Sequence, residues 1–170
     1  MLNSEELINK VKSYNKFLNP DKLNKAYNFA VKAHKNQKRD SGDPYSNHPI
    51  AVASILTELK LDSATIATGL LHDTIEDTHA TYETIKNEFG QEVADLVDGV
   101  TKISVFENQV TSTSKAENFR KLILATSKDI RVLLVKIADR LHNMRTIDAI
   151  LKVEKKERIA KETMEIYAPL

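Results

Sequence analysis

The sequence predicts an all-α fold, a helical bundle that forms one domain over residues 1–170. Only four Gly and four Pro occur, so the chain has few residues that interrupt helices. Between them, apolar residues recur at spacings of three and four, which is the period of an α-helix rather than the alternation of a strand. A chain of 170 residues is also long enough to bury a hydrophobic core of its own.

The spacing of apolar residues predicts which segments of the chain are helices and which are loops. Pro49 suits the first turn of the third helix, because an N–H at that position would have no partner within the helix. Apolar residues surround most of the helix that begins at Ile130, which indicates a core helix. Two longer loops are expected, Gln37 to His48 and a polar stretch from Phe106 to Ser114 that we expect to be mobile. The expected helices span Ser4 to Phe17, Pro20 to Lys35, Pro49 to Glu58, Ser63 to Asp77, Tyr82 to Phe89, Gln91 to Ser104, Lys115 to Thr126, Ile130 to Ile147 and Lys155 to Tyr167.

The composition limits the classes of function. With 25 Lys and Arg against 24 Asp and Glu, the chain has no strong net field, which argues against a polymeric nucleic-acid partner. The absence of Cys excludes disulfides and thiolate metal sites, so any metal must bind His and carboxylate side chains. The N-terminus has no signal-peptide pattern, and Arg131 and Lys136 interrupt the longest apolar stretch. We therefore expect a cytoplasmic protein that does not enter a membrane.

The segment from Leu71 to Asp77 concentrates charge at the end of the fourth expected helix. On a continuous helix, His72 lies four residues before Glu76 and Asp73 four before Asp77, so their side chains form one cluster. Carboxylates at a helix C-terminus oppose the helix dipole and repel one another, and a divalent cation would offset both effects. A solvated acidic helix end explains the spacing at least as well, although the apolar residues around the cluster indicate a buried setting.

Asp139 lies in the expected core helix, where a carboxylate is unfavourable unless it is paired or binds a metal. Asn143 and Thr146 follow at spacings of four and three, which places all three side chains on one stripe of the helix. Pairing of Asp139 with Arg140 or Lys136 is the structural alternative, and the segment taken alone slightly favours it.

His48 closes the first long loop and directly precedes Pro49. A lone His at a helix entrance is more often a hydrogen-bonding residue than a metal ligand. Its order in the chain changes this interpretation, because His48 is followed by His72-Asp73 and then by Asp139.

The order H…HD…D resembles the signature of the HD phosphohydrolase superfamily. More closely, the chain is similar to the hydrolase (HD) domain of the RelA/SpoT alarmone synthetase/hydrolase family, over roughly Ala26 to Leu170. The segments that carry the resemblance are Ser41-Gly42-Asp43-Pro44-Tyr45 with His48-Pro49, Leu71 to Thr78, Val97 to Lys102, Ala116 to Asn118 with Arg120-Lys121, and Lys136 to Thr146.

The resemblance implies an HD-domain helical bundle that binds Mn²⁺ and removes pyrophosphate from the 3′ position of ppGpp or pppGpp. It assigns the metal to His48, His72, Asp73 and Asp139, and assigns the catalytic apparatus to Glu76 and Asp77. Imidazole and carboxylate ligands suit Mn²⁺ and leave coordination positions open for water and a phosphate oxygen. Either of the two catalytic carboxylates could orient the attacking water or take its proton.

For the substrate, the resemblance places the Arg39 guanidinium against the guanine, with Asn143 and Thr146 near the nucleoside. The stripe from Asp139 supports the last two positions independently. Asp40 departs from the basic or small residue that many relatives carry, and Lys38 is the residue expected to compensate. Further candidates for contacts with the diphosphates are Lys102, Lys136, Arg140, Lys152, Lys155 and Lys156, each of which is also explained as a surface charge.

Two other classes of function remain open at this point. The metal site alone would serve other nucleotide substrates, and a regulatory module could keep the fold without catalysis. The complete set of His and carboxylate residues argues against the second class. The resemblance also allows the chain to be the N-terminal part of a bifunctional protein with a downstream synthetase domain, since the apolar segment Glu162 to Leu170 is similar to the connection between the two domains.

Overall fold

The computed structural model describes residues 1–108, 119–121, 123–124 and 128–170. These residues form helices and contain no strand apart from an isolated bridge between Lys38 and Pro44, so the expected all-α fold is confirmed. No helix in the described part of the chain is both long and apolar enough to cross a membrane. The helices are α1 (Ser4–Lys12), α2 (Pro20–Ala33), α3 (Asn47–Glu58), α4 (Ser63–Leu71), α5 (Thr74–Asp77), α6 (Tyr82–Phe89), α7 (Gln91–Glu107), α9 (Ile130–Arg145) and α10 (Val153–Glu162), with a 3₁₀ turn at Ile147–Ala149 and a π turn at Thr163–Tyr167.

Short polar side chains fix where several helices begin. Asn3 and Glu6 form a reciprocal capping box at the start of α1, in which each side chain bonds the other residue's backbone N–H. The Asn19 side chain caps α2, and Pro20 occupies its first turn. Asp129 accepts a hydrogen bond from the Arg131 N–H at the start of α9. These caps satisfy backbone donors that have no partner within the helix.

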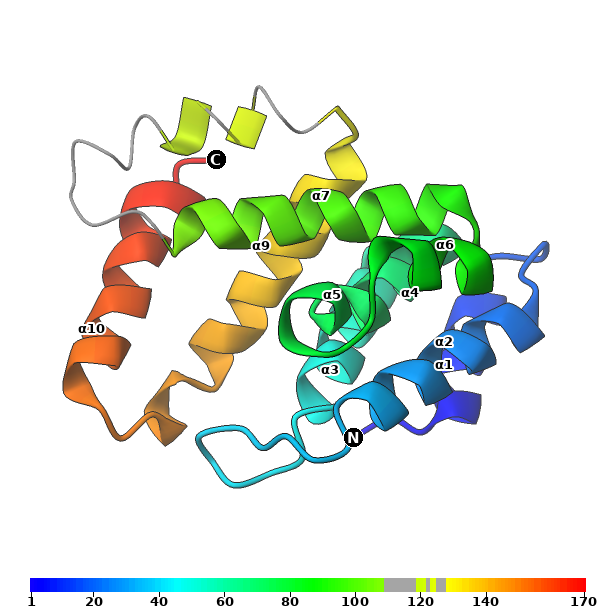
Figure 1. Cartoon of the computed structure of the whole chain (residues 1–170), viewed down its shortest axis with the longest axis horizontal. Helices are drawn as coiled ribbons and strands as arrows, with labels where there is room; N and C mark the ends of the chain where they lie inside the picture. Colours follow the sequence, from blue (N-terminus) through cyan, green and yellow to red (C-terminus); the bar gives the residue numbers. More distant parts are fainter. Residues whose placement is uncertain (109–118, 122, 125–127) are drawn as a thin grey trace.

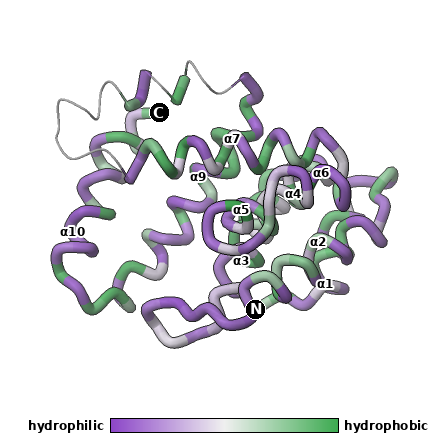
Figure 2. Tube along the Cα trace, viewed as in Figure 1, coloured by the Kyte–Doolittle hydropathy of each residue, from purple (hydrophilic) through white to green (hydrophobic). Residues whose placement is uncertain are grey.

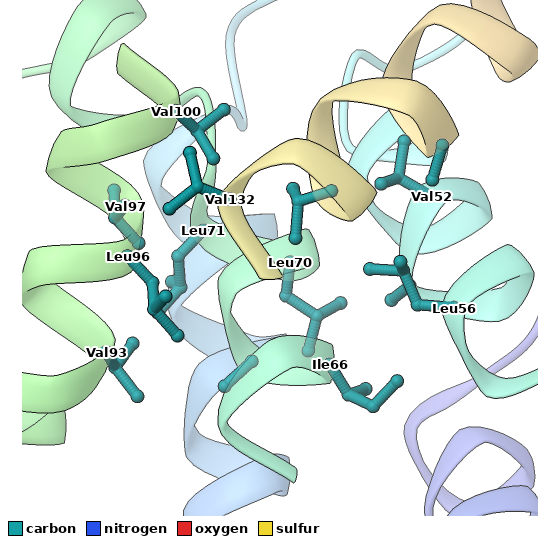
Figure 3. Packing of buried hydrophobic residues seen from close by; sticks show 14 of the residues in the cluster. Val52, Leu56, Ile66, Leu70, Leu71, Val93, Leu96, Val97, Val100 and Val132 are labelled. Atoms are coloured by element: carbon teal, nitrogen blue, oxygen red, sulfur yellow. The ribbon is translucent and has the colours of Figure 1, made fainter. Parts of the chain in front are cut away.

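The core is built around α4, which packs against α2, α3, α7 and α9. Every residue of α4 from Thr65 to Leu71 is buried. Ile66, Leu70 and Leu71 lie between side chains of α3 on one side and side chains of α7 on the other (Figure 3). Gly69 permits the close approach of α3, since a Cβ atom built there would lie 2.7 Å from Cδ1 of Leu56. The core thus places the C-terminal end of α4 beside α3 and α9.

The remaining elements lie at the edges of this core. In Figure 1, α10 stands at one side of the molecule and α1 and α2 lie at the opposite side. The loop between α2 and α3 is mostly hydrophilic (Figure 2). Gly42 has a φ of 88° in this loop, a conformation that favours glycine, and the Arg39 N–H bonds the Asp43 carbonyl at 2.9 Å. This turn holds Arg39 and Tyr45 in place at the mouth of the site described below.

Several helix boundaries differ from the prediction. The segment expected as one helix from Ser63 to Asp77 is broken at His72 and Asp73, which makes α5 a separate short helix. Helix α7 extends through Glu107, so the first two residues of the expected loop from Phe106 to Ser114 are helical instead. Most of that loop and most of the expected helix from Lys115 to Thr126 lie outside the described residues, although residues 119–121 are helical. The last expected helix ends in a π turn.

Candidate metal centre

Three segments that are distant in the sequence meet at one buried point. His48 lies in the first turn of α3, His72 directly follows α4, and Asp139 comes from α9. Each offers a ligand atom within 4.8 Å of the other two, and all three residues are buried. The Asp73 carboxylate joins them, with Oδ2 at 3.1 Å from His72 Nε2 and 3.7 Å from His48 Nε2. The donor set consists of imidazole nitrogens and carboxylate oxygens, which suits a divalent transition-metal ion.

His72 gives the strongest indication that the cluster fits a cation. Its Nδ1–H donates to the Gly69 carbonyl at 2.7 Å, which orients the ring and turns Nε2 toward the carboxylates. Nε2 is buried and has no hydrogen-bond partner among the described residues. Leaving a buried polar atom without a partner costs about 1–3 kcal/mol. Burial lowers the pKa of His72, but Asp73 and Asp139 outweigh that effect and raise it well above its ordinary value, so the position attracts positive charge.

The two carboxylates of the cluster are held by different partners. Oδ2 of Asp73 accepts the Tyr45 hydroxyl at 2.7 Å. Oδ1 of Asp139 lies 2.8 Å from His48 Nε2, and Oδ2 accepts Lys136 Nζ at 2.9 Å. Burial opposes ionisation of Asp139, but the Lys136 ammonium and the histidines outweigh it and hold the pKa well below the usual range. Burial likewise opposes ionisation of Asp73, and His72 and His48 lower its pKa. Both groups are therefore carboxylates at neutral pH.

Glu76 and Asp77 lie at the exposed rim of the cluster rather than inside it. Because α4 and α5 are separate, the predicted arrangement of His72 and Glu76 on one continuous helix is wrong. Asp77 Oδ2 lies 3.4 Å from the Tyr45 hydroxyl, and Glu76 Oε1 accepts Asn108 Nδ2 at 3.4 Å. Partial burial, then the neighbouring carboxylates, raise the pKa of both side chains. A raised pKa brings a carboxyl group closer to the range in which it can exchange protons near neutral pH.

Two cavities that share lining residues lie at these groups. The smaller, of 160 Å³, reaches Glu76 and three of the four proposed metal ligands. Its lining is Tyr45, His48, Asp73, Glu76, Ser104, Glu107, Asn108, Lys136, Asp139 and Asn143. The larger, of 740 Å³, shares Tyr45, His48 and Asn143 with it and extends toward α10. A molecule bound in the larger cavity can therefore reach the His and carboxylate cluster.

The residues predicted to contact a nucleotide lie together at the wall of the larger cavity. Arg39 donates to Thr146 Oγ1 at 2.9 Å and to Asn143 Oδ1 at 3.4 Å. Its guanidinium carbon lies 5.9 Å from the centre of the Tyr45 ring, and Lys38 lines the same cavity. The predicted stripe on α9 is present, with Asn143 Nδ2 donating to Asp139 Oδ1 at 3.2 Å.

Other basic residues among the predicted phosphate contacts are paired with carboxylates. Lys136 is buried between Asp139 and Glu107, and Arg140 is buried against Glu107 and Glu162. The structural alternative for Asp139, pairing with Lys136, is therefore present in addition to the cluster with the histidines. These two cations neutralise buried carboxylates. Lys136 also lines the smaller cavity, and Arg140 lines the larger one.

Three more of the predicted phosphate contacts, Lys102, Lys155 and Lys156, form ion pairs near the surface, the last with Asp148. Lys102 pairs with Asp98 on the surface of α7. Lys155 on α10 pairs with Asp40 at 2.6 Å and offsets the charge of this departure from the family pattern.

Two residues close to the cluster were not singled out from the sequence. The hydroxyl of Tyr45 bridges toward Asp73 and Asp77, and the Tyr45 ring stacks on His34 with centroids 4.8 Å apart. The Nδ1 atom of His142 lies 2.7 Å from Nδ1 of His48. Burial, His48 and Arg39 lower the pKa of His142 to about 4. Spacing along the chain could not reveal either contact, because each joins segments that only the fold brings together.

Comparison with known proteins gives consistent relatives. The HD domain family model matches residues 26–170. "GTP pyrophosphokinase rsh" of Brucella melitensis is 54% identical over 170 residues, which cover 100% of this chain and 22% of the relative. "Bifunctional (p)ppGpp synthase/hydrolase SpoT" of Escherichia coli is 52% identical over 149 residues, which cover 88% of this chain and 21% of the relative. The chain thus spans about a fifth of the length of these curated relatives.

A solved structure supports the fold. It comes from a study of "a metazoan ortholog of SpoT" that "hydrolyzes ppGpp and plays a role in starvation responses". The TM-score is 0.68 at 24% sequence identity, and the match covers 86% of this chain and 84% of the other. At this identity the likeness concerns the arrangement of helices.

Proposed function

Because this chain belongs to the HD domain family and its relatives are RelA/SpoT proteins, we propose that it hydrolyses the 3′-diphosphate of ppGpp or pppGpp in a reaction that depends on Mn²⁺. The products are GDP or GTP and pyrophosphate. The observation that carries the proposal is the buried Nε2 of His72, which has no hydrogen-bond partner in the described chain and faces two carboxylates. The proposal treats residues 1–170 as one hydrolase domain.

The metal ligands in this proposal are His48, His72, Asp73 and Asp139. A divalent cation supplies Lewis acidity, since it lowers the pKa of water and stabilises the negative charge that develops on phosphorus. The ligand residues come from three separate segments of the chain, so their approach depends on the packed core rather than on one loop. Lys136 keeps Asp139 ionised and oriented through the 2.9 Å hydrogen bond.

Glu76 and Asp77 have the catalytic role in the proposed reaction. Their exposed position at the rim of the 160 Å³ cavity leaves them free to contact an attacking water. Glu76 lines this cavity, and Asp77 approaches it through the Tyr45 hydroxyl. One of the two carboxylates orients the water and accepts its proton as water attacks the 3′-diphosphate in line with the leaving oxygen.

The substrate lies in the larger cavity in this proposal, with its 3′-diphosphate directed toward the cluster. The Arg39 guanidinium stacks against the guanine, and its present hydrogen bonds to Asn143 and Thr146 keep it at the wall. Asn143 and Thr146 contact the nucleoside, and Lys38 supplies positive charge at the same wall. Such contacts would select the alarmone over other nucleotides, which share only the phosphate chemistry.

The proposal extends to the natural setting of the chain. We place the reaction in the cytoplasm and propose that the natural protein continues into a synthetase domain, as the names of its longer relatives suggest. Neither a membrane nor a polymeric nucleic acid takes part.

The experiment is to incubate the purified chain with ppGpp and Mn²⁺, with and without a chelator, and to separate the products by ion exchange. Asp73→Asn is the matched control, since it keeps the size of the side chain and removes the charge. We expect GDP and pyrophosphate from the parent with metal, and neither product from the chelated or variant protein. Cleavage of deoxynucleoside triphosphates instead of ppGpp would support another substrate class. Absence of both metal binding and nucleotide cleavage would support a regulatory module.

A further inference from the structure

Helix α5 carries both proposed catalytic carboxylates, although it spans only the four residues Thr74–Asp77. A helix this short is not stable by itself, so contacts with the rest of the fold must decide where its side chains point. Thr74 is fully buried and Ile75 packs against the core, which fixes the first half of α5. Glu76 and Asp77 are exposed, so the second half depends on other contacts.

Gln37, in the loop between α2 and α3, contacts the end of α5. Its side-chain Nε2 donates to the backbone carbonyl of Asp77 at 2.6 Å. The other polar atom of the same amide, Oε1, is an acceptor and lies 2.7 Å from Nδ1 of His34. His34 is buried, so a ring in the core fixes one side of the amide. The reverse orientation of the amide would place Oε1 against the Asp77 carbonyl, where two acceptors repel each other.

The loop that contains Gln37 reaches Asp77 at a second point. The backbone carbonyl of Gln37 accepts the Tyr45 N–H at 2.9 Å, which joins the two ends of the loop. The Tyr45 hydroxyl lies 3.4 Å from Oδ2 of Asp77. Asp77 is therefore held at its backbone by Gln37 and approached at its carboxylate by Tyr45. Two points of attachment restrict the direction of a side chain more than one does.

We propose that Gln37 is a positioning residue for Asp77, which holds the end of α5 so that the carboxylate stands beside the attacking water. The inference rests on the proposed function, in which Asp77 has a catalytic role. Gln37 is absent from the described residues that line the two cavities at the cluster. The proposed metal ligands come from α3, α9 and the residues before α5. Loss of Gln37 should therefore slow the chemical step without weakening substrate or metal binding.

Two variants of Gln37 separate the bond to Asp77 from the contact with His34. Gln37→Met has a similar length and loses both hydrogen bonds. Gln37→Glu keeps an acceptor for His34 but turns a second oxygen toward the Asp77 carbonyl, so only the donor to Asp77 is lost. The matched control is Gln91→Met, since Gln91 is exposed at the start of α7, at the far end of that helix from Glu107.

Steady-state kinetics with ppGpp and isothermal titration with Mn²⁺ test the proposed role in the whole chain. We expect kcat to fall by about 10- to 100-fold in both Gln37 variants, because a small displacement of a reacting group has effects of this size. KM, Mn²⁺ affinity and the Gln91→Met control should match the parent. Parent-like kcat in Gln37→Glu would overturn the inference, and so would a loss of kcat that is accompanied by an equal loss of Mn²⁺ affinity.

Amide hydrogen exchange followed by NMR tests the anchor without requiring catalysis. The N–H groups of Asp77 and Thr78 donate to the carbonyls of Asp73 and Thr74 at 2.9 and 3.1 Å. In Gln37→Met these two amides should exchange about 2- to 10-fold faster, the equivalent of one lost hydrogen bond. Unchanged exchange would overturn the inference. If the parent cleaves no ppGpp, the proposed function fails, and faster exchange in the variant would still support the contact of Gln37 as the anchor of Asp77.

Discussion

Tyr45 donates its phenolic hydrogen to Oδ2 of Asp73 across 2.7 Å. The bond joins the loop before α3 to the break between α4 and α5, two segments 28 residues apart in the sequence. The Tyr45 ring is held in turn by His34, with centroids 4.8 Å apart. Tyr45 therefore fixes one oxygen of a proposed metal ligand, and the other carboxylate near its hydroxyl, that of Asp77, is a proposed catalytic group.

Removal of this hydroxyl should impair catalysis more than folding. Tyr45→Phe keeps the ring on His34 and deletes only the donor to Asp73. We expect kcat for ppGpp to fall by about 10-fold, and Mn²⁺ affinity to fall by a comparable factor, because partners that orient a ligand typically contribute on this scale. Steady-state kinetics and metal titration measure the two effects. A parent-like kcat would show that the hydroxyl does not orient either carboxylate.

Arg39 should determine substrate affinity through its planar guanidinium. Arg39→Lys keeps the charge but loses the fork that bonds Asn143 and Thr146 and the flat surface that stacks on a base. We expect KM for ppGpp to rise by roughly 10-fold, the equivalent of one charged hydrogen bond, with little change in kcat. Arg131→Lys is the matched control, since Arg131 pairs with Asp62, Glu92 and Asp129 away from the cavity. Equal KM values in the two variants would argue against the proposed guanine site.

The buried ammonium of Lys136 should be important for stability. Lys136→Met leaves the carboxylates of Asp139 and Glu107 buried with less compensating charge. Breaking a buried ion pair typically destabilises a protein by about 3–5 kcal/mol. The control is Lys102→Met, which breaks an exposed pair with Asp98 and should change stability by less than about 1 kcal/mol. Urea unfolding of both variants measures the difference, and similar values would contradict the buried network.

The approach of α3 to α4 should depend on the absence of a side chain at position 69. A Cβ atom at Gly69 would lie 2.7 Å from Leu56 Cδ1 and 3.3 Å from the Ala53 Cα. Gly69→Ala should therefore destabilise the fold by about 1–3 kcal/mol, the usual range for overpacking. The double variant with Leu56→Val should recover part of this loss, because the shorter side chain vacates the contact. Thermal unfolding of the parent, the two single variants and the double variant tests the energetic coupling between positions 56 and 69. Strictly additive effects of the two substitutions would exclude this coupling.

Asp129 should make the stability of the fold depend on pH in the acidic range. Hydrogen bonds from the Arg131 side chain and backbone lower the pKa of Asp129 from its ordinary value of 3.8. A lowered folded-state pKa contributes stability above the unfolded-state pKa, and this contribution disappears as the pH falls through the folded-state value. We expect the melting temperature of Asp129→Asn to lie below that of the parent near about pH 6. This difference in melting temperature should become smaller at about pH 3. A difference of constant size would show that the ionised form contributes nothing.

The helical pattern was sufficient to predict the fold class and most of the helices. Tyr82–Phe89 matches its predicted bounds, and α3, α7 and α9 lie within a few residues of theirs. Apolar spacing indicates which face of a helix is buried, because the apolar side chains on that face pack into the core. The break after Leu71 escaped prediction because the spacing continues across it without a Gly or Pro.

The candidate site, like the fold, could be predicted only in part from the sequence. His48, His72, Asp73 and Asp139 could be named from their order in the chain, and the structure brings them together. The pair between Lys136 and Asp139 was one of the alternatives open from the sequence. The contacts of Lys136 and Arg140 with Glu107 and Glu162 could not be predicted, because the burial of a charged side chain depends on which elements pack around it. The same reason applies to His142, whose contact with His48 spans 94 residues.

The break between α4 and α5 has a geometric consequence for the cluster. On an uninterrupted α-helix with 3.6 residues per turn, adjacent side chains point about 100° apart and diverge. Where α4 stops, the backbone turns, and the side chains of His72 and Asp73 converge until Nε2 and Oδ2 are 3.1 Å apart. A substitution that fused the two helices into one continuous rod would therefore separate two neighbouring residues without replacing either of them.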